Sequence, residues 1–427
     1  MPILTRRQFI GTAGVAATAA GALAWRPREQ GAPHDAYFVA ISRALHTAGI
    51  ATPTLVLDLA RVRANTAQVQ QHVHGRLRLR LVNKSLPCLP LLDELGKLTG
   101  TPRQMVFSLP YLHLITQARP QSDVLLGKPL PAAAAARYYA TRPASGFDPA
   151  AQLQWLVDTP ERLKQYRDLA RSQGQRMHIN IEIDVGLHRG GVPDLSTLQT
   201  MVQLLAEEPL LQWSGLMGYD AHTEKIPDVG GLRQQARSNA RLAYQRFADH
   251  MQHGPLKAEP AGATFNTGGS PSFRLHDGSG AANEVAVGSA MVKPADFDTP
   301  LLSAMQPAVF IATPVLKAGP FVAPDGVQAL SQLAGAWDAN QRQAVFIYGG
   351  HWLAQPVSPA GLSPSSLIGP SSNQQILLGS GRQQLQPDDF VFLRPTQSEA
   401  VLQQFGDIAV YEQGRITDMW PVFPAQA

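Results

Sequence analysis

Lys84 is expected to lie at the C-terminal end of a β-strand, where its side chain presents an amine. The alternating run 78–84 reads Arg-Leu-Arg-Leu-Val-Asn-Lys, which predicts a half-buried strand that closes on this side chain. A rigid strand end aims the amine and partial burial favours its neutral, nucleophilic form, so the position suits Schiff-base chemistry. Because a single lysine is more often an exposed surface residue, the assignment depends on what accompanies Lys84.

Two further segments offer partners for such an amine. Arg189 follows a strand-like run within 178–192, at a glycine-bounded turn, and a fixed guanidinium there suits an anionic oxygen. A loop arginine in an ordinary salt bridge is the alternative. The run 264–272 carries two adjacent glycines between hydroxyl residues, so its amides can converge on a phosphate; a plain turn is the alternative. The predicted phosphate cup comprises Thr267, Gly268, Gly269, Gly288 and Ser289.

Polar residues also stand at the end of the predicted strand 213–219. Tyr219, Asp220 and His222 place a phenol, a carboxylate and an imidazole at one rim, although buried capping groups would explain them equally well. An amine, a cation and a phosphate cup on different strands together match pyridoxal phosphate, since its aldehyde, ring oxygen and phosphate need these three groups. Tyr219 and His222 are therefore candidate catalytic residues beside Lys84.

The elements that must position these side chains alternate between strands and helices. The expected strands cover 54–57, 77–82, 105–109, 123–126, 153–157, 179–185, 213–219, 263–266 and 284–287. Helix-like stretches between them include 59–72, 160–172, 195–207 and 231–251. This repetition predicts an α/β fold, a parallel (β/α)8 TIM-type barrel over residues 36–300. No Gly-x-Gly-x-x-Gly follows an early strand, which weakens a dinucleotide-binding alternative.

From about residue 301 the pattern changes to short strands without helices between them. These strands are expected at 308–316, 344–348, 375–379, 389–393, 408–411 and 416–420. Residues 301–427 therefore predict a C-terminal β domain. The segment 356–373, rich in Ser, Pro and Gly, is expected to form a long loop.

Residues 1–24 have the features of a twin-arginine export signal. Arg6 and Arg7 precede a weakly apolar Gly/Ala stretch, and 22–24 offer a small-x-small cleavage site. A membrane anchor is the alternative, but the apolar run is short and rich in Ala and Gly. Since this pathway exports folded proteins, often with a cofactor already inserted, we expect a periplasmic cofactor protein that is not membrane-bound after export.

Composition sets further limits on function. The 427 residues carry a net charge of +4, with 16% charged residues, which gives no case for binding nucleic acid or an anionic membrane. The single cysteine, Cys88, leaves no partner for an intrachain disulfide or a thiolate metal cluster. Its apolar neighbours predict a buried structural thiol.

Several ordered motifs resemble the D-threonine aldolase and D-serine dehydratase family. They occur at 52–58 with Asn65, 80–85, 184–191, 215–219, 267–269 and 283–289. The resemblance implies an alanine-racemase-type barrel of fold type III followed by a β domain, with pyridoxal phosphate as cofactor and a small D-amino acid as substrate. It also implies a homodimer whose active site lies between the barrel and the partner subunit's β domain.

The resemblance assigns roles to the residues already singled out. By implication Lys84 forms the Schiff base with the cofactor, Arg189 contacts the cofactor's phenolic oxygen, and Tyr219 lines the site. The predicted phosphate cup would hold the phosphate. The chain departs from the family directly after Lys84, where Ser-Leu-Pro replaces the usual Thr-His-Lys.

A second departure concerns a divalent metal. The family holds this metal on a His and a Cys or Asp near the C-terminus, whereas Gln397 and Glu399 occupy the aligned positions here. The Ser-x-Glu-His element that usually precedes this region is also changed, at 372–375. Because a glutamine carbonyl is a weak substitute for imidazole, we do not expect a tight zinc site.

Together these observations predict a pyridoxal-phosphate-dependent lyase acting on a D-amino acid with a β-hydroxyl. His222, His351 or Glu399 is a candidate base for that hydroxyl. An amino-acid racemase is an alternative that needs a second acid/base group opposite Lys84, for which Tyr219 is a candidate. A cofactor-binding protein without turnover is another, since the metal motif is altered.

Overall fold

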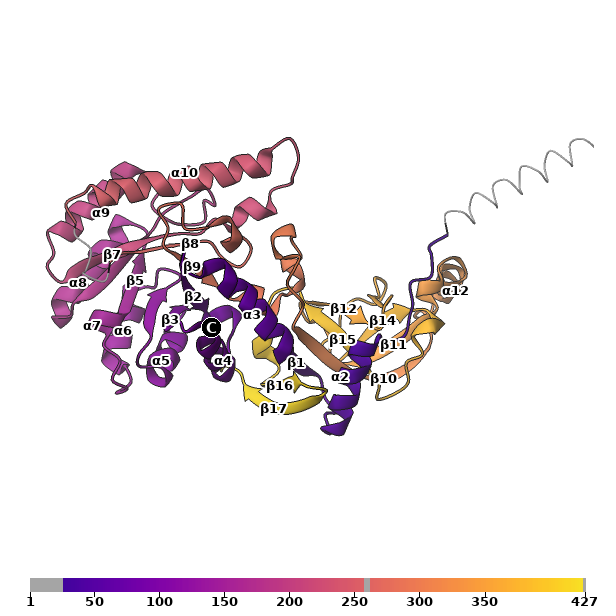
Figure 1. Cartoon of the computed structure of the whole chain (residues 1–427). Coiled ribbons are helices and arrows are strands. Elements are labelled where there is room, and N and C mark those ends of the chain that lie inside the picture. Colours follow the sequence, from indigo (N-terminus) through magenta and orange to yellow (C-terminus); the bar gives the residue numbers. More distant parts are fainter. Residues whose placement is uncertain (1–25, 257–261, 425–427) are drawn as a thin grey trace, which may run out of the picture. The chain divides into compact units, whose positions relative to one another are not determined.

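The computed structural model describes residues 26–256 and 262–424 (Figure 1). The expected export signal at 1–24 lies outside these described residues. The chain forms two compact units. The barrel unit draws on residues 55–309, 395–412 and 417–427, and the sheet unit draws on 1–54, 310–394 and 413–416.

Parallel strands close the barrel of the first unit, β2 through β9 in sequence order. They are β2 (Arg78–Val82), β3 (Arg103–Val106), β4 (Asp123–Leu126), β5 (Leu153–Val157), β6 (Met177–Glu182), β7 (Leu211–Gly218), β8 (Thr264–Thr267) and β9 (Glu284–Val287). Strands β2 and β9 pair in register, Arg78 opposite Glu284, which completes the ring. The predicted fold class, a TIM-type barrel with a β domain, is confirmed.

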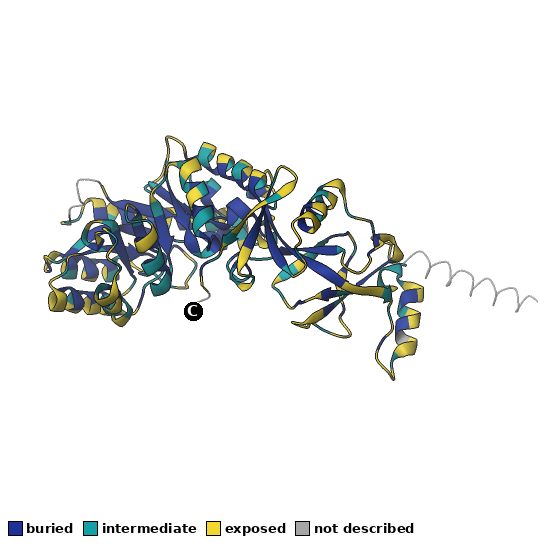
Figure 2. Cartoon of the chain, turned by 90° about the horizontal axis from the view of Figure 1, so that it is seen from below, coloured by how far each residue is buried: buried dark blue, intermediate teal, exposed yellow. Residues whose placement is uncertain are grey.

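Helices lie between the strands along the chain and cover the barrel (Figure 1). Their bounds are α3 (Leu59–Val73), α4 (Leu89–Thr99), α5 (Leu109–Ala118), α6 (Ala132–Thr141), α7 (Pro149–Gln152), α8 (Pro160–Gln173), α9 (Leu195–Ala206), α10 (Leu232–Gln252) and α11 (Ser289–Val292). Side-chain caps fix several starts: Thr159 accepts from the Arg162 amide and Asp194 from the Thr197 amide. Figure 2 shows buried strands and helices whose outer faces are exposed, the amphipathic pattern that surface helices require.

One predicted barrel strand lies elsewhere. The segment Thr54–Asp58 forms β1, which is not part of the closed barrel and instead pairs in parallel with β16 (Asp407–Glu412). Every residue of β1 is buried, so its apolar run resembles that of a barrel strand in the sequence. Asp58 then caps α3 by accepting a hydrogen bond from the Arg61 amide. The expectation of a barrel strand at 54–57 was therefore wrong.

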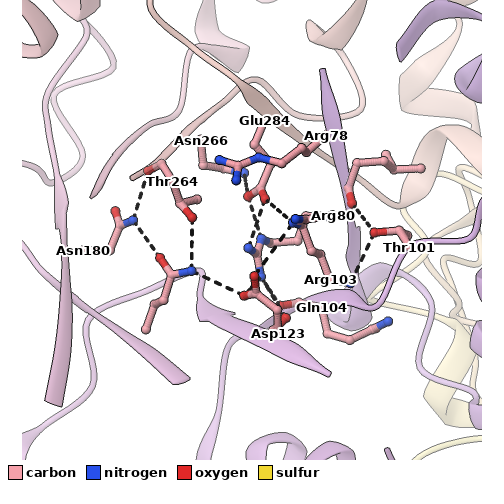
Figure 3. A network of polar contacts seen from close by, with 12 residues as sticks. Arg78, Arg80, Thr101, Arg103, Gln104, Asp123, Asn180, Thr264, Asn266 and Glu284 are labelled. Atoms are coloured by element: carbon pink, nitrogen blue, oxygen red, sulfur yellow. Dashed lines mark hydrogen bonds and ion pairs between the residues drawn. The ribbon is translucent and has the colours of Figure 1, made fainter. Parts of the chain in front are cut away.

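A charged network fills part of the barrel interior (Figure 3). The Arg80 guanidinium binds both carboxylate oxygens of Glu284, at 2.6 and 3.0 Å, and also donates to Asp123 at 3.0 Å. The Arg80 and Glu284 side chains are fully buried. Asn266 donates to Glu284 at 2.9 Å, which links β8 to β9. Paired charges and hydrogen bonds compensate the desolvation of this network and join neighbouring strands.

The sheet unit is built mainly from antiparallel strands. They are β10 (Val309–Pro320), β11 (Gln343–Tyr348), β12 (Ala354–Ser358), β13 (Ser363–Pro364), β14 (Gln374–Gly379) and β15 (Phe390–Pro395). Strand β10 pairs with β11 and β15, and β14 pairs with β11 and β13. The helix α2 (Ala36–Thr47), capped by Asp35, also belongs to this unit.

The sheet unit differs from expectation in two places. Helix α12 (Gln328–Trp337) interrupts the region expected to hold strands without helices. The expected loop at 356–373 contains the end of β12 and the short strand β13. No side-chain cap marks the start of α12, and tertiary pairing rather than a local pattern decides the conformation of β12 and β13.

The compact units also do not follow the predicted division at residue 300. Residues 36–54, including α2, belong to the sheet unit, and 395–412 return to the barrel unit. Strand β17 (Arg415–Pro421) follows β16 along the chain. Among the described residues, no helix is long and apolar enough to cross a membrane.

Candidate active site

Lys84 lies at the end of β2, on a single 3-10 turn, Asn83–Ser85. Its side chain is 42% exposed and enters a pocket at the carboxyl ends of the barrel strands, where barrel active sites form. The Lys84 ammonium lies 4.6 Å from the centroid of the Phe107 ring. The amine is therefore accessible to a ligand and held by an aromatic face and a turn.

Glu399 contributes a carboxylate to the same pocket. Its Oε1 lies 3.5 Å from Lys84 Nζ. Ser398 donates a hydrogen bond to Glu399 Oε2 at 3.1 Å, and the Ser85 and Ser289 hydroxyls lie 3.5 Å from that oxygen. A carboxylate and an amine thus stand side by side, with hydroxyl groups around the carboxylate.

Arg189 and Tyr219 face one another in the pocket. The Arg189 guanidinium carbon lies 5.2 Å from the centroid of the Tyr219 ring, within the range of a cation–π contact. Burial raises the pKa of the Tyr219 phenol above its usual value, and the positive charge of Arg189 offsets part of that effect. Tyr219 is therefore a neutral hydrogen-bonding group near pH 7.

The glycine loop after β8 lies against the start of α11. The Ser270 hydroxyl oxygen accepts hydrogen bonds from the amides of Gly288 and Ala290, at 3.1 and 3.0 Å. Ser270 thus ties the glycine loop to the start of α11 and fixes the loop at this edge of the pocket. Ser270 was absent from the predicted cup, although it stands in the same hydroxyl-rich run.

Two close contacts in the pocket require glycine, and the groups that line the pocket fit pyridoxal phosphate. A Cβ atom at Gly269 would lie 2.6 Å from Tyr219 Cε2, and one at Gly288 would lie 2.9 Å from Ser85 Cβ. Only glycine therefore leaves room for the Tyr219 ring and for the Lys84 turn. An amine, a guanidinium and the glycine loop line one space, so Lys84, Arg189 and that loop would hold the cofactor.

Glu182, at the end of β6, is a further pocket residue that sequence reasoning did not single out. Its Oε2 lies 3.8 Å from Lys128 Nζ, beyond hydrogen-bond distance. Burial raises the pKa of the Glu182 carboxyl, and the charge of Asp158 adds to that effect, while Lys128 and Arg189 oppose it. Glu182 is the final residue of β6, and no local sequence pattern indicates that its carboxyl lies in the pocket.

The structure does not bring every predicted site residue into the pocket. Tyr219, Gly268, Gly269, Gly288 and Ser289 line it together with Lys84 and Arg189. Thr267 does not, because its hydroxyl is buried and donates to the Gly218 carbonyl. His222 lies on the 3-10 helix Ala221–Lys225 and does not line the pocket. Its Nε2 lies close to Gly186, where an added Cβ atom would be only 3.2 Å away. His351 belongs to the sheet unit.

Asp220 has a role that is visible in the structure. Ser272 donates to its Oδ1 at 2.5 Å, and His276 Nε2 lies 2.7 Å from its Oδ2. Burial opposes ionisation of this carboxyl, but the hydrogen bonds from His276 and Ser272 outweigh it, so the pKa of Asp220 lies below its usual value. Asp220 therefore ties the end of β7 to the segment after the glycine loop.

The two residues aligned with the family's metal positions bind other side chains of the protein. The Gln397 amide donates to Asp296 at 2.9 Å. Glu399 pairs with Lys84, and a lysine ammonium beside a carboxylate competes with a cation. In the part of the chain that the structure describes, no three His, Cys, Asp or Glu residues form a group that could hold a metal ion. These side chains do not fit a tight metal site.

Comparison with known proteins places the barrel in a family. The model of the alanine racemase N-terminal domain matches residues 57–295, more than half of the chain. No curated protein sequence matches the chain.

Solved structures resemble the chain over most of its length. A D-threonine aldolase from Filomicrobium marinum has 17% identity and a TM-score of 0.68, covering 87% of this chain and 94% of that one. The D-threo-3-hydroxyaspartate dehydratase from Delftia sp. HT23 has 16% identity and a TM-score of 0.68, covering 88% and 98%. An alanine racemase from Bacillus anthracis has 13% identity and a TM-score of 0.62, covering 87% and 98%. At these identities the likeness shows the fold alone.

Proposed function

Because the chain belongs to the alanine racemase N-terminal domain family, we propose that it is a pyridoxal-phosphate enzyme that acts on a D-amino acid. The observation that carries the proposal is the position of Lys84. Its amine enters a pocket that also receives the Arg189 guanidinium and the glycine loop 268–270. These are the groups that an aldehyde, a ring oxygen and a phosphate require.

The chemistry divides between cofactor and protein. Bound pyridoxal phosphate withdraws electrons from the bonds at the substrate's Cα. Lys84 would hold the cofactor, and its amine could take or return a proton at the substrate's Cα. Arg189 fixes the orientation by its charge and by its contact with Tyr219. The glycine loop, which Ser270 ties to the amides of Gly288 and Ala290, would face the cofactor's phosphate.

We further propose that the reaction is a lyase reaction on a β-hydroxy D-amino acid. Two of the similar structures, a D-threonine aldolase and a D-threo-3-hydroxyaspartate dehydratase, support this choice by their names. A carboxylate beside Lys84, that of Glu399, supplies a group able to exchange a proton with a hydroxyl.

A racemase is the second candidate, and one observation favours it. Tyr219 lines the same pocket as Lys84 and supplies a phenol that can carry a proton at Cα. The fold likeness to an alanine racemase is consistent with this candidate. A cofactor-binding protein without turnover is the third.

Turnover assays separate the three. Purified holoenzyme is incubated with D-threonine, D-serine and D-alanine, and products are separated on a chiral column. Glycine with an aldehyde marks an aldolase, and a keto acid with ammonia marks a dehydratase; either supports the lyase proposal. Optical inversion would replace it by the racemase, and no conversion of any substrate would favour the binding protein.

We also propose that the protein is exported by the twin-arginine pathway to the periplasm and acts there as a homodimer. The proposal rests on the arginine pair and cleavage pattern of residues 1–24 and on the family resemblance. N-terminal sequencing of protein from the periplasmic fraction should begin near residue 25. Full-length protein that stays in the cytoplasm would contradict the export proposal. Light scattering should give twice the mass of one chain.

A further inference from the structure

We infer that Glu399 accepts the proton of the substrate's β-hydroxyl, so that the enzyme cleaves the Cα–Cβ bond in a retro-aldol reaction that needs no divalent metal. The inference rests on the proposed function and names its reaction and its base. It starts from a carboxylate that lies 3.5 Å from Lys84 Nζ and is surrounded by hydroxyl groups.

The surroundings of Glu399 suit a proton acceptor. The Ser398 hydroxyl donates to its Oε2, and the same hydroxyl also contacts Ser289 at 2.9 Å. The Glu399 side chain remains 33% exposed, and a third hydroxyl, that of Ser85, lies 3.5 Å from Oε2. A carboxylate held by hydroxyl donors keeps its orientation, and an accessible one can receive a further hydroxyl, that of a substrate.

The other ionisable groups near the pocket are placed less well for this task. Glu182 has Lys128 as its nearest cation, not Lys84, and the charge of Asp158 acts against its ionisation. His222 does not line the pocket. Among the described lining residues, Glu399 is thus the carboxylate in ion-pair contact with Lys84.

In the proposed cleavage, Glu399 and Lys84 take up and return every proton that moves. The hydroxyl proton passes to the Glu399 carboxylate, and the electron pair of the broken O–H bond forms the carbonyl of the aldehyde. The Cα–Cβ bond breaks, its pair remains on Cα, and Cα takes up a proton from Lys84 to give glycine. The proton on Glu399 then returns to Lys84 across their 3.5 Å contact.

Dehydration makes a different demand on the same carboxyl. Loss of hydroxide from Cβ requires an acid that protonates a poor leaving group. Glu399 lies 3.5 Å from the Lys84 amine and accepts a hydrogen bond from Ser398, so its carboxylate is oriented as a proton acceptor. This geometry suits the base that aldol cleavage needs.

The test compares E399Q and E399D with wild-type holoenzyme, and Q397A serves as the control. Gln397 stands at the other altered metal position but binds Asp296 and does not line the pocket. Glycine and aldehyde release from D-threonine is measured with and without EDTA. Cofactor stoichiometry by absorbance and metal content by elemental analysis are measured for each protein.

We expect E399Q to bind cofactor fully and to lose about 100-fold to 10,000-fold in cleavage rate, the usual loss when a general base is removed. E399D should retain part of the rate, and Q397A and EDTA should leave it unchanged. Wild-type rate in E399Q overturns the inference, as does a stoichiometric metal whose removal stops cleavage. Wild-type protein that binds no cofactor and cleaves nothing overturns the proposed function, and this inference with it.

Discussion

The Tyr219 ring links the residues of the site to one another. One side of the ring meets the Arg189 guanidinium at 5.2 Å, and Gly269 packs against its edge. A shift of the glycine loop would therefore move the Tyr219 ring and, with it, Arg189, the cation expected at the cofactor's ring oxygen. Lys84 is held independently, by its turn, the Phe107 ring and Glu399. Cofactor affinity should thus depend on Gly269 even though glycine has no side chain.

Gly269→Ala tests this dependence. The added Cβ would lie 2.6 Å from Tyr219 Cε2, so the ring or the loop must move. Overpacking of this kind costs about 1–3 kcal/mol, and we expect cofactor affinity to fall by roughly tenfold, which corresponds to about 1.4 kcal/mol. Titration of apoprotein with pyridoxal phosphate measures it. Gly280→Ala is the control, because no atom lies within 4 Å of its Cβ position. Equal affinity in both variants would contradict the coupling.

At the scale of elements, the barrel presents the site by tying strand ends together. The Asp220 carboxylate, two residues after the end of β7, binds Ser272 and His276 on either side of the 3-10 turn Phe273–Leu275. His276 Cδ2 would lie 3.2 Å from a Cβ atom at Gly268, so this tie reaches the glycine loop. A buried ionised group therefore helps to fix the loop, in addition to its packing against the Tyr219 ring.

Asp220→Asn should show a characteristic pH dependence. The native pKa of Asp220 is lowered, so its contribution to stability is present above the unfolded value of about 3.9 and is lost as pH falls through the native value. We expect a loss of about 1–3 kcal/mol near pH 7, and the difference from wild type should shrink below about pH 4. Urea unfolding from pH 7 to pH 3 measures this, with exposed Asp168→Asn as control. A pH-independent loss would show that packing, not charge, holds the loop.

The sequence predicts the barrel elements well and their surroundings less well. Short buried runs separated by helical stretches mark the strands from β2 to β9, and cap residues such as Thr159 and Asp194 mark helix starts. The apolar run of β1 has the same appearance as a barrel strand, and only its pairing with β16 distinguishes it. Lys84, Arg189 and the glycine loop carry local signals at strand ends. Contacts such as that between Lys84 and Glu399 join residues far apart in the chain, and no local pattern encodes them.

At the scale of the whole molecule, the last part of the chain returns to the barrel unit. Phe423 is 2% exposed, and its ring packs edge-on against Tyr111 with centroids 4.9 Å apart. Its amide donates to the Pro87 carbonyl at 2.7 Å. Val422 forms a bridge with Cys88, the thiol that was predicted to be buried and is fully so; its burial raises the pKa of Cys88 to about 11. The segment that follows Lys84 is thus covered by the C-terminal end.

Phe423→Ala should therefore weaken the barrel unit. Truncation of a fully buried phenylalanine costs about 3–5 kcal/mol, because it removes apolar burial and leaves a cavity. The expected result is a lower denaturant midpoint with loss of bound cofactor at lower denaturant than in wild type. Met419→Ala, at a position that is 42% exposed, should change stability by no more than about 0.5 kcal/mol. Identical midpoints for both variants would show that the C-terminal end is dispensable.

The central claim is that Lys84 carries pyridoxal phosphate, and reductive trapping tests it most directly. Purified protein is reduced with borohydride, digested, and its peptides are sequenced by mass spectrometry. We predict one stoichiometric label on the peptide that contains Lys84, and none on Lys84→Ala, which should also lose the visible absorbance of the bound cofactor. A label on another lysine, or an unlabelled Lys84 in protein that contains cofactor, would contradict the assignment.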